Sequence, residues 1–354
     1  MTTEPRQAEW KPIMVDGYRR EEEDAAACHP YHFLVSGPRN LPSPNWKDLL
    51  HSSWKDPDYR RTAMACFVQA AYLLELDRQE KRAEAAGLAP NWWKPFRYKL
   101  RRTLVDARDG SIYGAVLEWD RVAAMADLVL ARPRGAPKLV LALRGTLLRR
   151  PTARRDLMDD LRFVARESLK GSVRFAGALE VVRAAAERFG SAGVCVCGHS
   201  LGAAFALQVG KALAKEGLLV ECHLFNPPSV SLAASLRIAG EKASYALRRT
   251  PHPSKKLASG STVNTWRARW LPNLYVNNND YICCYYGVSS EQDTGGEGDR
   301  VAKLFVVAKG PTSFLEAHGL QQWWSDDLEL ELAANDSKLI NRQLRSLYAF
   351  SDRS

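Results

Sequence analysis

Ser200 follows Gly198 and His199 and precedes Leu201 and Gly202, which gives the spacing Gly-X-Ser-X-Gly. A short apolar run enters this segment, and an alanine-rich, helix-forming run leaves it. This layout is typical of a nucleophile elbow, in which a tight strand-to-helix turn aims a serine hydroxyl at a substrate. The two glycines suit such a turn, because side chains there would strike the neighbouring strand or helix. An ordinary turn that carries a surface serine is the alternative.

A serine nucleophile needs a histidine base and an acid, and elbow hydrolases carry them in the order serine, acid, histidine. His318 lies far downstream of Ser200, with an acid at a strand end before it. It follows the apolar run at residues 304–308, so we expect it on a loop past the end of that strand. A packed, hydrogen-bonded core histidine is the alternative.

Asp280 is the acid that the sequence favours, because it ends an apolar strand that runs into a cluster of turn-forming asparagines. From that place a carboxylate can accept the Nδ1 proton of the imidazole and stabilise the imidazolium that forms. Asp293 and Asp299 are rivals by order, but their polar, glycine-rich stretch indicates an exposed loop. Glu316 is too near His318 in the chain to face its ring easily.

An oxyanion hole needs backbone donors just after the nucleophile and in a loop after an earlier strand. Leu201 supplies the first N–H. Thr146 is the second candidate, because the apolar run at residues 138–143 stops at Arg144, Gly145 and Thr146. Gly145 allows a sharp turn, and Thr146 offers both an N–H and a hydroxyl. The alternative is that Thr146 only caps a following helix.

These segments together resemble the class 3 (fungal-type) lipases, and more closely the plant lipase-like or esterase-like branch of that family. The resemblance covers roughly residues 100–325. It implies an α/β-hydrolase fold, a triad of Ser200, Asp280 and His318, and hydrolysis of carboxylic esters of lipids. We expect no metal and no other cofactor. The segments that carry it are residues 143–146, 160–161, 198–203, 225–228, 280 and 316–319.

Departures from that family lie close to the expected site. Asn226, Pro227 and Pro228 stand where Gly-Ala-Pro is common, so the pocket wall beside the serine differs. Leu157 replaces a common tryptophan, the usual histidine on the helix before the elbow is missing around residues 173–175, and a basic stretch at 231–261 lengthens the gap before Asp280.

Length and element order favour one α/β domain. The chain has 354 residues, of which 46% are hydrophobic, enough to bury a large core. We predict a partly irregular N-terminal extension at residues 1–57 and a hydrolase domain at 58–354, with a mainly parallel sheet flanked by helices. Predicted helices span 59–86, 154–168, 173–189, 201–215, 321–334 and 337–348, and predicted strands 112–119, 127–131, 138–143, 194–197, 219–225, 271–276 and 304–308.

Cysteine usage and the N-terminal segment predict the compartment. None of the seven cysteines has zinc-site spacing, and Cys195 and Cys197 in the elbow strand read as small buried apolar residues. Residues 1–30 are charged and lack an apolar signal core, and no apolar run approaches the roughly 20 residues that cross a bilayer. We expect a cytoplasmic protein, soluble or peripherally attached to a membrane.

The net charge of +10 indicates an anionic partner. Basic and aromatic residues mix at 92–102, but no nucleic-acid module accompanies them, so we expect no nucleic-acid binding. An anionic membrane surface fits better, because Leu147, Leu148, Arg149 and Arg150 open a basic segment, residues 147–155. By the resemblance this segment occupies the lid position. A solvated basic loop is the alternative.

Two functions fit these residues. The first is hydrolysis of a lipid or a small ester by Ser200, His318 and Asp280. The second is a non-catalytic lipase-like regulator, as in certain plant immune proteins. Those proteins tend to add a large helical C-terminal domain, whereas only a short tail follows His318 here. The sequence does not indicate which oligomeric state the protein adopts.

Overall fold

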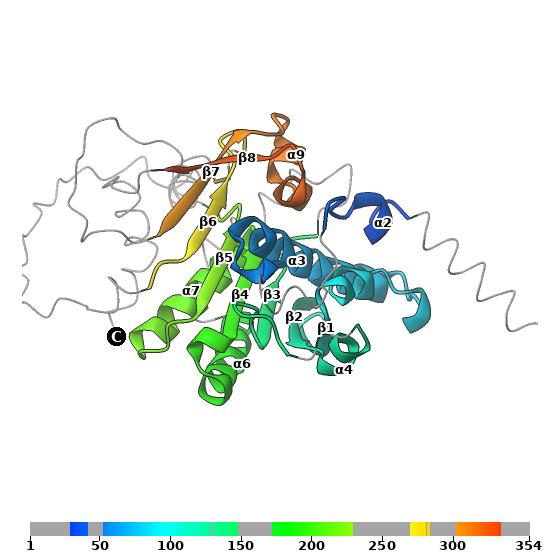
Figure 1. Ribbon diagram of the computed structural model, residues 1–354, viewed down its shortest axis with the longest axis vertical. Coiled ribbons are helices and arrows are strands. Elements are labelled where there is room, and N and C mark those ends of the chain that lie inside the picture. Colours follow the sequence, from blue (N-terminus) through cyan, green and yellow to red (C-terminus); the bar gives the residue numbers. More distant parts are fainter. Residues whose placement is uncertain are drawn as a thin grey trace, which may run out of the picture.

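The computed structural model describes residues 29–41, 52–127, 129, 131–147, 172–228, 270–280, 282–283 and 302–333. Within these ranges the chain forms one eight-stranded sheet, whose strands lie side by side in sequence order (Figure 1). The predicted mainly parallel sheet is confirmed, because β3 to β7 pair in parallel and β1, β2 and β8 pair antiparallel at the edges. The strands are β1 (Tyr98–Val105), β2 (Ile112–Trp119), β3 (Leu139–Leu143), β4 (Val194–His199), β5 (Glu221–Phe225), β6 (Asn273–Val276), β7 (Lys303–Lys309) and β8 (Glu329–Ala333).

Helices accompany the sheet along the described chain. The long ones are α3 (Pro57–Gln79), α6 (Val173–Phe189) and α7 (Leu201–Lys215). Short α-helices are α2 (Phe33–Ser36), α4 (Arg121–Ala126) and α9 (Phe314–His318). Single 3₁₀ turns are η2 (Ser53–Lys55), η3 (Glu84–Ala86), η4 (Ala89–Trp92), η5 (Lys94–Phe96), η7 (Ser191–Gly193) and η9 (Leu320–Trp324).

The sheet is buried on both faces, with α3 on one and α6 and α7 on the other (Figure 1). Successive side chains of a strand point to opposite faces. In β3, Val140 and Ala142 therefore join the core under α3, while Leu139 and Leu141 join the core under α6 and α7. Burial on both faces explains why the inner strands read as continuous apolar runs rather than as alternating ones.

The long helices begin at the signals that the sequence carries. Asp56 caps α3 by accepting a hydrogen bond from the Asp58 amide, and a proline occupies the first helical position. Ser172 caps α6 in the same way, and α6 is followed by Gly190, whose φ of 78° few other residues adopt readily. The predicted helices over 173–189 and 201–215 are confirmed, whereas α3 ends at Gln79, before the predicted end at residue 86.

The predicted helix over residues 321–334 is wrong. The chain makes only the 3₁₀ turn η9 there and then enters strand β8, which pairs antiparallel with β7. The reason is the alternation Glu329, Leu330, Glu331, Leu332, which has the period of a strand. Leu330 packs against the core, while Leu332 is 63% exposed on this edge strand.

The predicted strand over residues 127–131 is also wrong at the positions that the structure describes. Asp120 accepts hydrogen bonds from the amides of Val122 and Ala123 and so starts α4. Asp127 caps the end of that helix, and the Val129 amide donates to Ala124 rather than to a strand. The amides of Asp127 and Val129 both bind the end of α4, so they do not join a strand.

Two further predicted helices are not tested. The predicted helices over 154–168 and 337–348 lie outside the described residues. Parts of the segment before residue 58 pack against the domain: Trp54 is 3% exposed and joins the core under α3, and Phe33 and Leu41 pack against the same core. Among the helices that the structure describes, none is both long enough and apolar enough to span a lipid bilayer.

Candidate active site

Ser200 sits on the turn between β4 and α7. Its φ of 53° and ψ of −123° lie in a region that residues other than glycine rarely adopt. The Ser200 amide donates to the Phe225 carbonyl at 3.0 Å, which fixes the turn against the neighbouring strand β5. The hydroxyl therefore lies at the carboxyl ends of the parallel strands, at the start of α7.

The two glycines of the elbow have no room for a side chain. A Cβ on Gly198 would lie 2.4 Å from the Gly202 carbonyl oxygen. A Cβ on Gly202 would lie 2.3 Å from the Leu143 carbonyl oxygen, at the end of β3. Both obstacles are backbone atoms, so the tight turn requires glycine at positions 198 and 202.

The Ser200 hydroxyl is buried and unpaired. The residue is 1% exposed, and within the described part of the chain its Oγ has no hydrogen-bond partner. A buried hydroxyl without a partner costs about 1–3 kcal/mol of stability, so it is uncommon outside functional sites. The amino end of α7 adds a positive partial charge beside it, which favours negative charge developing there.

His318 and Asp280 form a buried pair. His318 Nδ1 lies 2.8 Å from Asp280 Oδ2, and the two residues are 2% and 0% exposed. With Nδ1 directed at the carboxylate, Nε2 is the ring atom that can take a proton from a hydroxyl. His318 ends the short helix α9, whereas the sequence placed it on a loop.

Asp280 stays ionised in spite of its burial. Burial by itself raises the pKa of this carboxyl, but the charge and hydrogen bond of His318 outweigh it and the net pKa is lowered. The Ile282 amide donates to Oδ1 at 3.0 Å, and the Cys283 thiol donates to Oδ2 at 3.2 Å. An ionised carboxylate in this position can stabilise an imidazolium.

Asn226 is a site residue that the sequence did not assign. It follows β5 with a φ of 46°, and its Nδ2 donates to Asp280 Oδ2 at 2.8 Å and to the Ala317 carbonyl at 3.0 Å. The Trp323 indole donates to Asn226 Oδ1 at 2.8 Å, which fixes the orientation of the amide. The available signal was the asparagine standing where the resembled family has glycine.

His199, in the elbow, contacts both Tyr72 of α3 and His318 of α9. Its Nδ1 lies 2.8 Å from the Tyr72 hydroxyl, and its Nε2 lies 2.7 Å from the His318 carbonyl oxygen. The His199 and His318 rings are neighbours, with centroids 4.8 Å apart. Burial and the neighbouring His318 lower the pKa of His199 to about 3, so it remains neutral. A neutral His199 accepts from Tyr72 and donates to the carbonyl.

The loop after β3 passes next to the serine. The Gly145 amide donates to the Tyr72 hydroxyl at 2.8 Å, and a Cβ on Gly145 would lie 2.9 Å from Ser200 Cβ. Thr146 follows at once and is half-buried, and Leu201 is the first residue of α7. Of the two residues predicted for the oxyanion hole, Leu201 thus follows Ser200 directly, and Thr146 follows the glycine that packs against Ser200.

The buried Arg144 anchors the loop after β3 through hydrogen bonds to backbone carbonyl groups. Its Nε donates to the Ile112 carbonyl, and its guanidinium also donates to the Gly145 carbonyl at 2.8 Å. Leu147 is half-buried at the end of the loop. The remaining lid residues predicted from the sequence, Leu148, Arg149 and Arg150, lie outside the described residues.

Of the three rival acids, the structure describes Glu316. Glu316 is exposed and accepts a hydrogen bond from the Ser313 hydroxyl at 2.7 Å, so it does not face the His318 ring. Asp293 and Asp299 lie outside the described residues. The structure therefore brings Asp280 and His318 together beside the elbow of Ser200.

No protein-family model matches this chain. Among solved structures, a lipase from Rhizopus microsporus var. chinensis is 13% identical and aligns with a TM-score of 0.39 over 87% of this chain and 90% of that chain. Lipase II from Rhizopus niveus is 18% identical, with a TM-score of 0.35 over 64% of this chain and 74% of that chain.

A relative of known name is closer in sequence. A protein of Arabidopsis thaliana named GDSL esterase/lipase is 30% identical over an alignment 345 residues long; the alignment covers 84% of this chain and 96% of that protein. The tetrapeptide Gly-Asp-Ser-Leu does not occur in this sequence, where Gly198 to Leu201 reads Gly-His-Ser-Leu. The identity and the coverage show the family: the chain belongs to the plant lipase-like and esterase-like family of α/β-hydrolases.

Proposed function

We propose that this chain is a serine hydrolase that cleaves carboxylic esters of lipids through an acyl-enzyme on Ser200. The observation that carries the proposal is the buried pair of His318 and Asp280, 2.8 Å apart, next to an elbow whose serine hydroxyl has no partner within the described residues. Membership of an esterase and lipase family supports the same class of reaction.

Acylation starts when Ser200 Oγ bonds to the carbonyl carbon of the ester and its proton passes to His318 Nε2. The charge that develops on the carbonyl oxygen is stabilised by the Leu201 amide and by the amide or hydroxyl of Thr146. The imidazolium then gives its proton to the departing alcohol oxygen, and the acyl group stays on the serine.

Deacylation repeats these steps with water. His318 takes a proton from the water molecule, whose oxygen bonds to the acyl carbon and displaces Ser200 Oγ. The serine recovers its proton from the imidazolium, and the carboxylic acid leaves. Throughout, Asp280 holds Nδ1 of the ring and stabilises its positive charge, which its lowered pKa permits.

A lipid substrate at an anionic surface is the finer part of the proposal. The chain carries a net charge of +10, and each Lys or Arg near an anionic membrane contributes about 1 kcal/mol. The basic segment 147–155 begins directly after Thr146 and carries two leucines beside its arginines. Long-chain acylglycerol should therefore be hydrolysed faster on vesicles with anionic lipid than on neutral vesicles.

Labelling with a fluorophosphonate probe tests the chemistry. The wild-type protein should be labelled, and Ser200→Ala should abolish labelling together with hydrolysis of p-nitrophenyl esters. Loss of a triad member lowers kcat by about four to six orders of magnitude in serine hydrolases. Ser325→Ala, at an exposed serine after η9, is the matched control and should keep full labelling.

Equal labelling of the wild type and Ser200→Ala would contradict the proposal and would favour the non-catalytic regulator. Activity confined to short soluble esters, and unchanged by vesicles of either charge, would be consistent with an esterase but would contradict a lipid substrate. His318→Gln should slow labelling while leaving Ser200 in place, because the base is lost and the nucleophile remains.

A further inference from the structure

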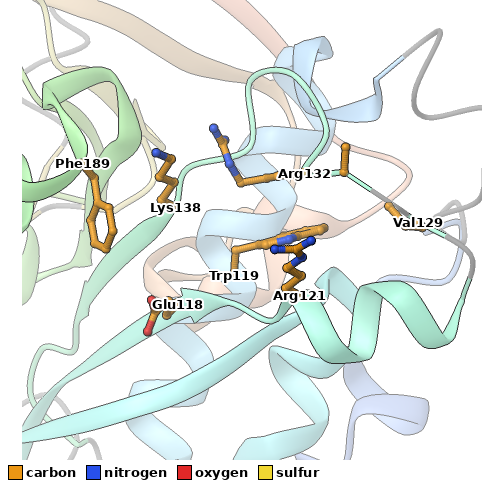
Figure 2. A pocket seen from close by; sticks show the side chains of 8 residues that line it. Glu118, Trp119, Arg121, Val129, Arg132, Lys138 and Phe189 are labelled. Atoms are coloured by element: carbon orange, nitrogen blue, oxygen red, sulfur yellow. The ribbon is translucent and has the colours of Figure 1, made fainter.

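A cavity of about 320 Å³ lies at the other end of the sheet from Ser200. Its lining includes Trp119 at the end of β2 and Lys138 just before β3, whose backbones are joined by a hydrogen bond of 3.0 Å (Figure 2). Ser200, in contrast, follows the carboxyl end of β4, which runs parallel to β3. The cavity is therefore separate from the candidate active site.

Three cations line this cavity. They are Arg121 at the start of α4, Arg132 in the loop before β3, and Lys138 (Figure 2). Within the described residues none of the three forms an ion pair. Lys138 Nζ lies over the ring of Phe189, 5.6 Å from its centroid. The cavity thus gathers positive charge that the described chain does not neutralise.

The acids near the cavity form ion pairs with cations outside its lining. Glu118, the one acid in the lining, pairs with Arg101 of β1 at 3.0 Å. Asp120 pairs with Lys99 at 3.7 Å. Asp127, at the end of α4, pairs with Arg97. Lys99 and Arg101 of β1, together with Arg97 just before it, therefore pair with the acids around the cavity and leave the lining cations available to an anion.

Trp119 gives the cavity a fixed aromatic wall. Its ring meets Tyr98 edge-on, with centroids 5.7 Å apart and an interplanar angle of 88°. Tyr98 is buried and its hydroxyl donates to the Pro137 carbonyl at 2.6 Å, so this support is rigid. Trp119 itself is half-buried and lines the cavity between α4 and the loop of Arg132 (Figure 2).

We propose that this cavity binds a small phosphate monoester that carries a planar ring, of the nucleoside monophosphate class. Arginine guanidinium groups match phosphate oxygens in pairs, and a doubly charged phosphate suits a site with three cations. The flat ring of Trp119 suits stacking against a ring of the ligand. A volume of about 320 Å³ is at the small end of ligand pockets, which limits the ligand to one phosphate and one ring system.

Calorimetric titration of the full chain with adenosine monophosphate tests this site. Binding should be saturable, and adenosine or inorganic phosphate alone should bind at least about tenfold more weakly, because each lacks half of the recognised groups. Arg132→Gln should weaken binding at least about tenfold. Arg134→Gln, an exposed arginine two residues further on in the same loop and outside the lining, should leave it unchanged.

Two more variants separate loss of binding from loss of folding, and this cavity from the proposed hydrolase site. Lys138→Gln should also weaken binding, which covers the case that Arg132→Gln does not fold. Ser200→Ala should bind adenosine monophosphate as the wild type does, since the cavity is separate from the proposed hydrolase site. Equal losses in Arg132→Gln and Arg134→Gln would overturn the proposal. So would binding to phosphatidic acid vesicles without binding to adenosine monophosphate, which would assign the cations to a lipid surface.

Discussion

Oxygen Oδ2 of Asp280 accepts hydrogen bonds from three side chains, and only His318 among them belongs to the proposed triad. Asn226 and Cys283 share this oxygen, and Asn226 also holds the Ala317 carbonyl directly before His318. One amide therefore fixes the acid relative to the backbone that carries the base. Asn226 is a positioning residue for the proposed reaction, since it acts through Asp280.

Asn226→Gly should lower kcat for ester hydrolysis about tenfold or more and leave KM nearly unchanged, because a hydrogen bond to a charged group is lost. Glycine suits this test, since it adopts the φ of 46° without strain and only the amide disappears. Steady-state kinetics measure the change. Asn279→Gly, at an exposed asparagine directly before Asp280, is the control. An unchanged kcat in Asn226→Gly would remove its positioning role.

His199 should make the protein less stable in mild acid. Its pKa is about 3 in the folded protein and about 6.5 when unfolded, so below pH 6.5 only the unfolded chain takes up this proton. The stability that His199 contributes is thus present above pH 6.5 and falls by about 2 kcal/mol between pH 7 and pH 5.

Urea unfolding at pH 7 and pH 5 measures this change for the wild type and for His199→Gln. Glutamine can accept from Tyr72 and donate to the His318 carbonyl, yet it does not titrate. The variant should lose about 2 kcal/mol less than the wild type over this interval. Equal losses in the two proteins would show that His199 is not held neutral by its surroundings.

At the scale of elements, the turn between β4 and α7 allows no methyl group. Gly202→Ala should lower the free energy of unfolding by several kcal/mol, because a Cβ there would overlap the carbonyl groups of Leu143, at the end of β3, and of Arg144 just after it. Urea midpoints and soluble yield measure the effect. Gly193→Ala, whose nearest contact would be 3.3 Å away, should cost far less. A fully stable Gly202→Ala would contradict the close approach.

The elements that the sequence predicted well are those with strong local signals. Buried apolar runs marked β3, β4 and β5, and helical spacing of apolar residues marked most of α3. Strand β1 was missed because its sequence mixes basic and aromatic residues, and it is an edge strand whose Lys99 and Arg101 are exposed. Strand β8 was misread because its strand pattern is short and follows a 3₁₀ turn.

For the candidate site, the sequence predicted the acid and the base but not the residues that contact them. Chain order and strand ends pointed to Asp280 and His318, which the structure places 2.8 Å apart. The contacts of Asn226, Tyr72 and His199 could not be predicted, because they join segments separated by 54 to 127 residues. Such pairings depend on how the strands are ordered in the sheet, which local sequence patterns do not contain.

The segment before α3 belongs to the same folded unit as the sheet. The Trp54 ring meets Tyr59 edge-on, with centroids 5.3 Å apart, and lies tilted against Tyr98, with centroids 5.8 Å apart, although the sequence placed Trp54 in the partly irregular extension. Trp54→Ala should lower the free energy of unfolding by about 3–5 kcal/mol, because it leaves a cavity under α3. Urea unfolding measures this loss, with Val122→Ala, at a residue 75% exposed, as a control that should change little. A loss as small as the control's would mean that the domain starts after this residue.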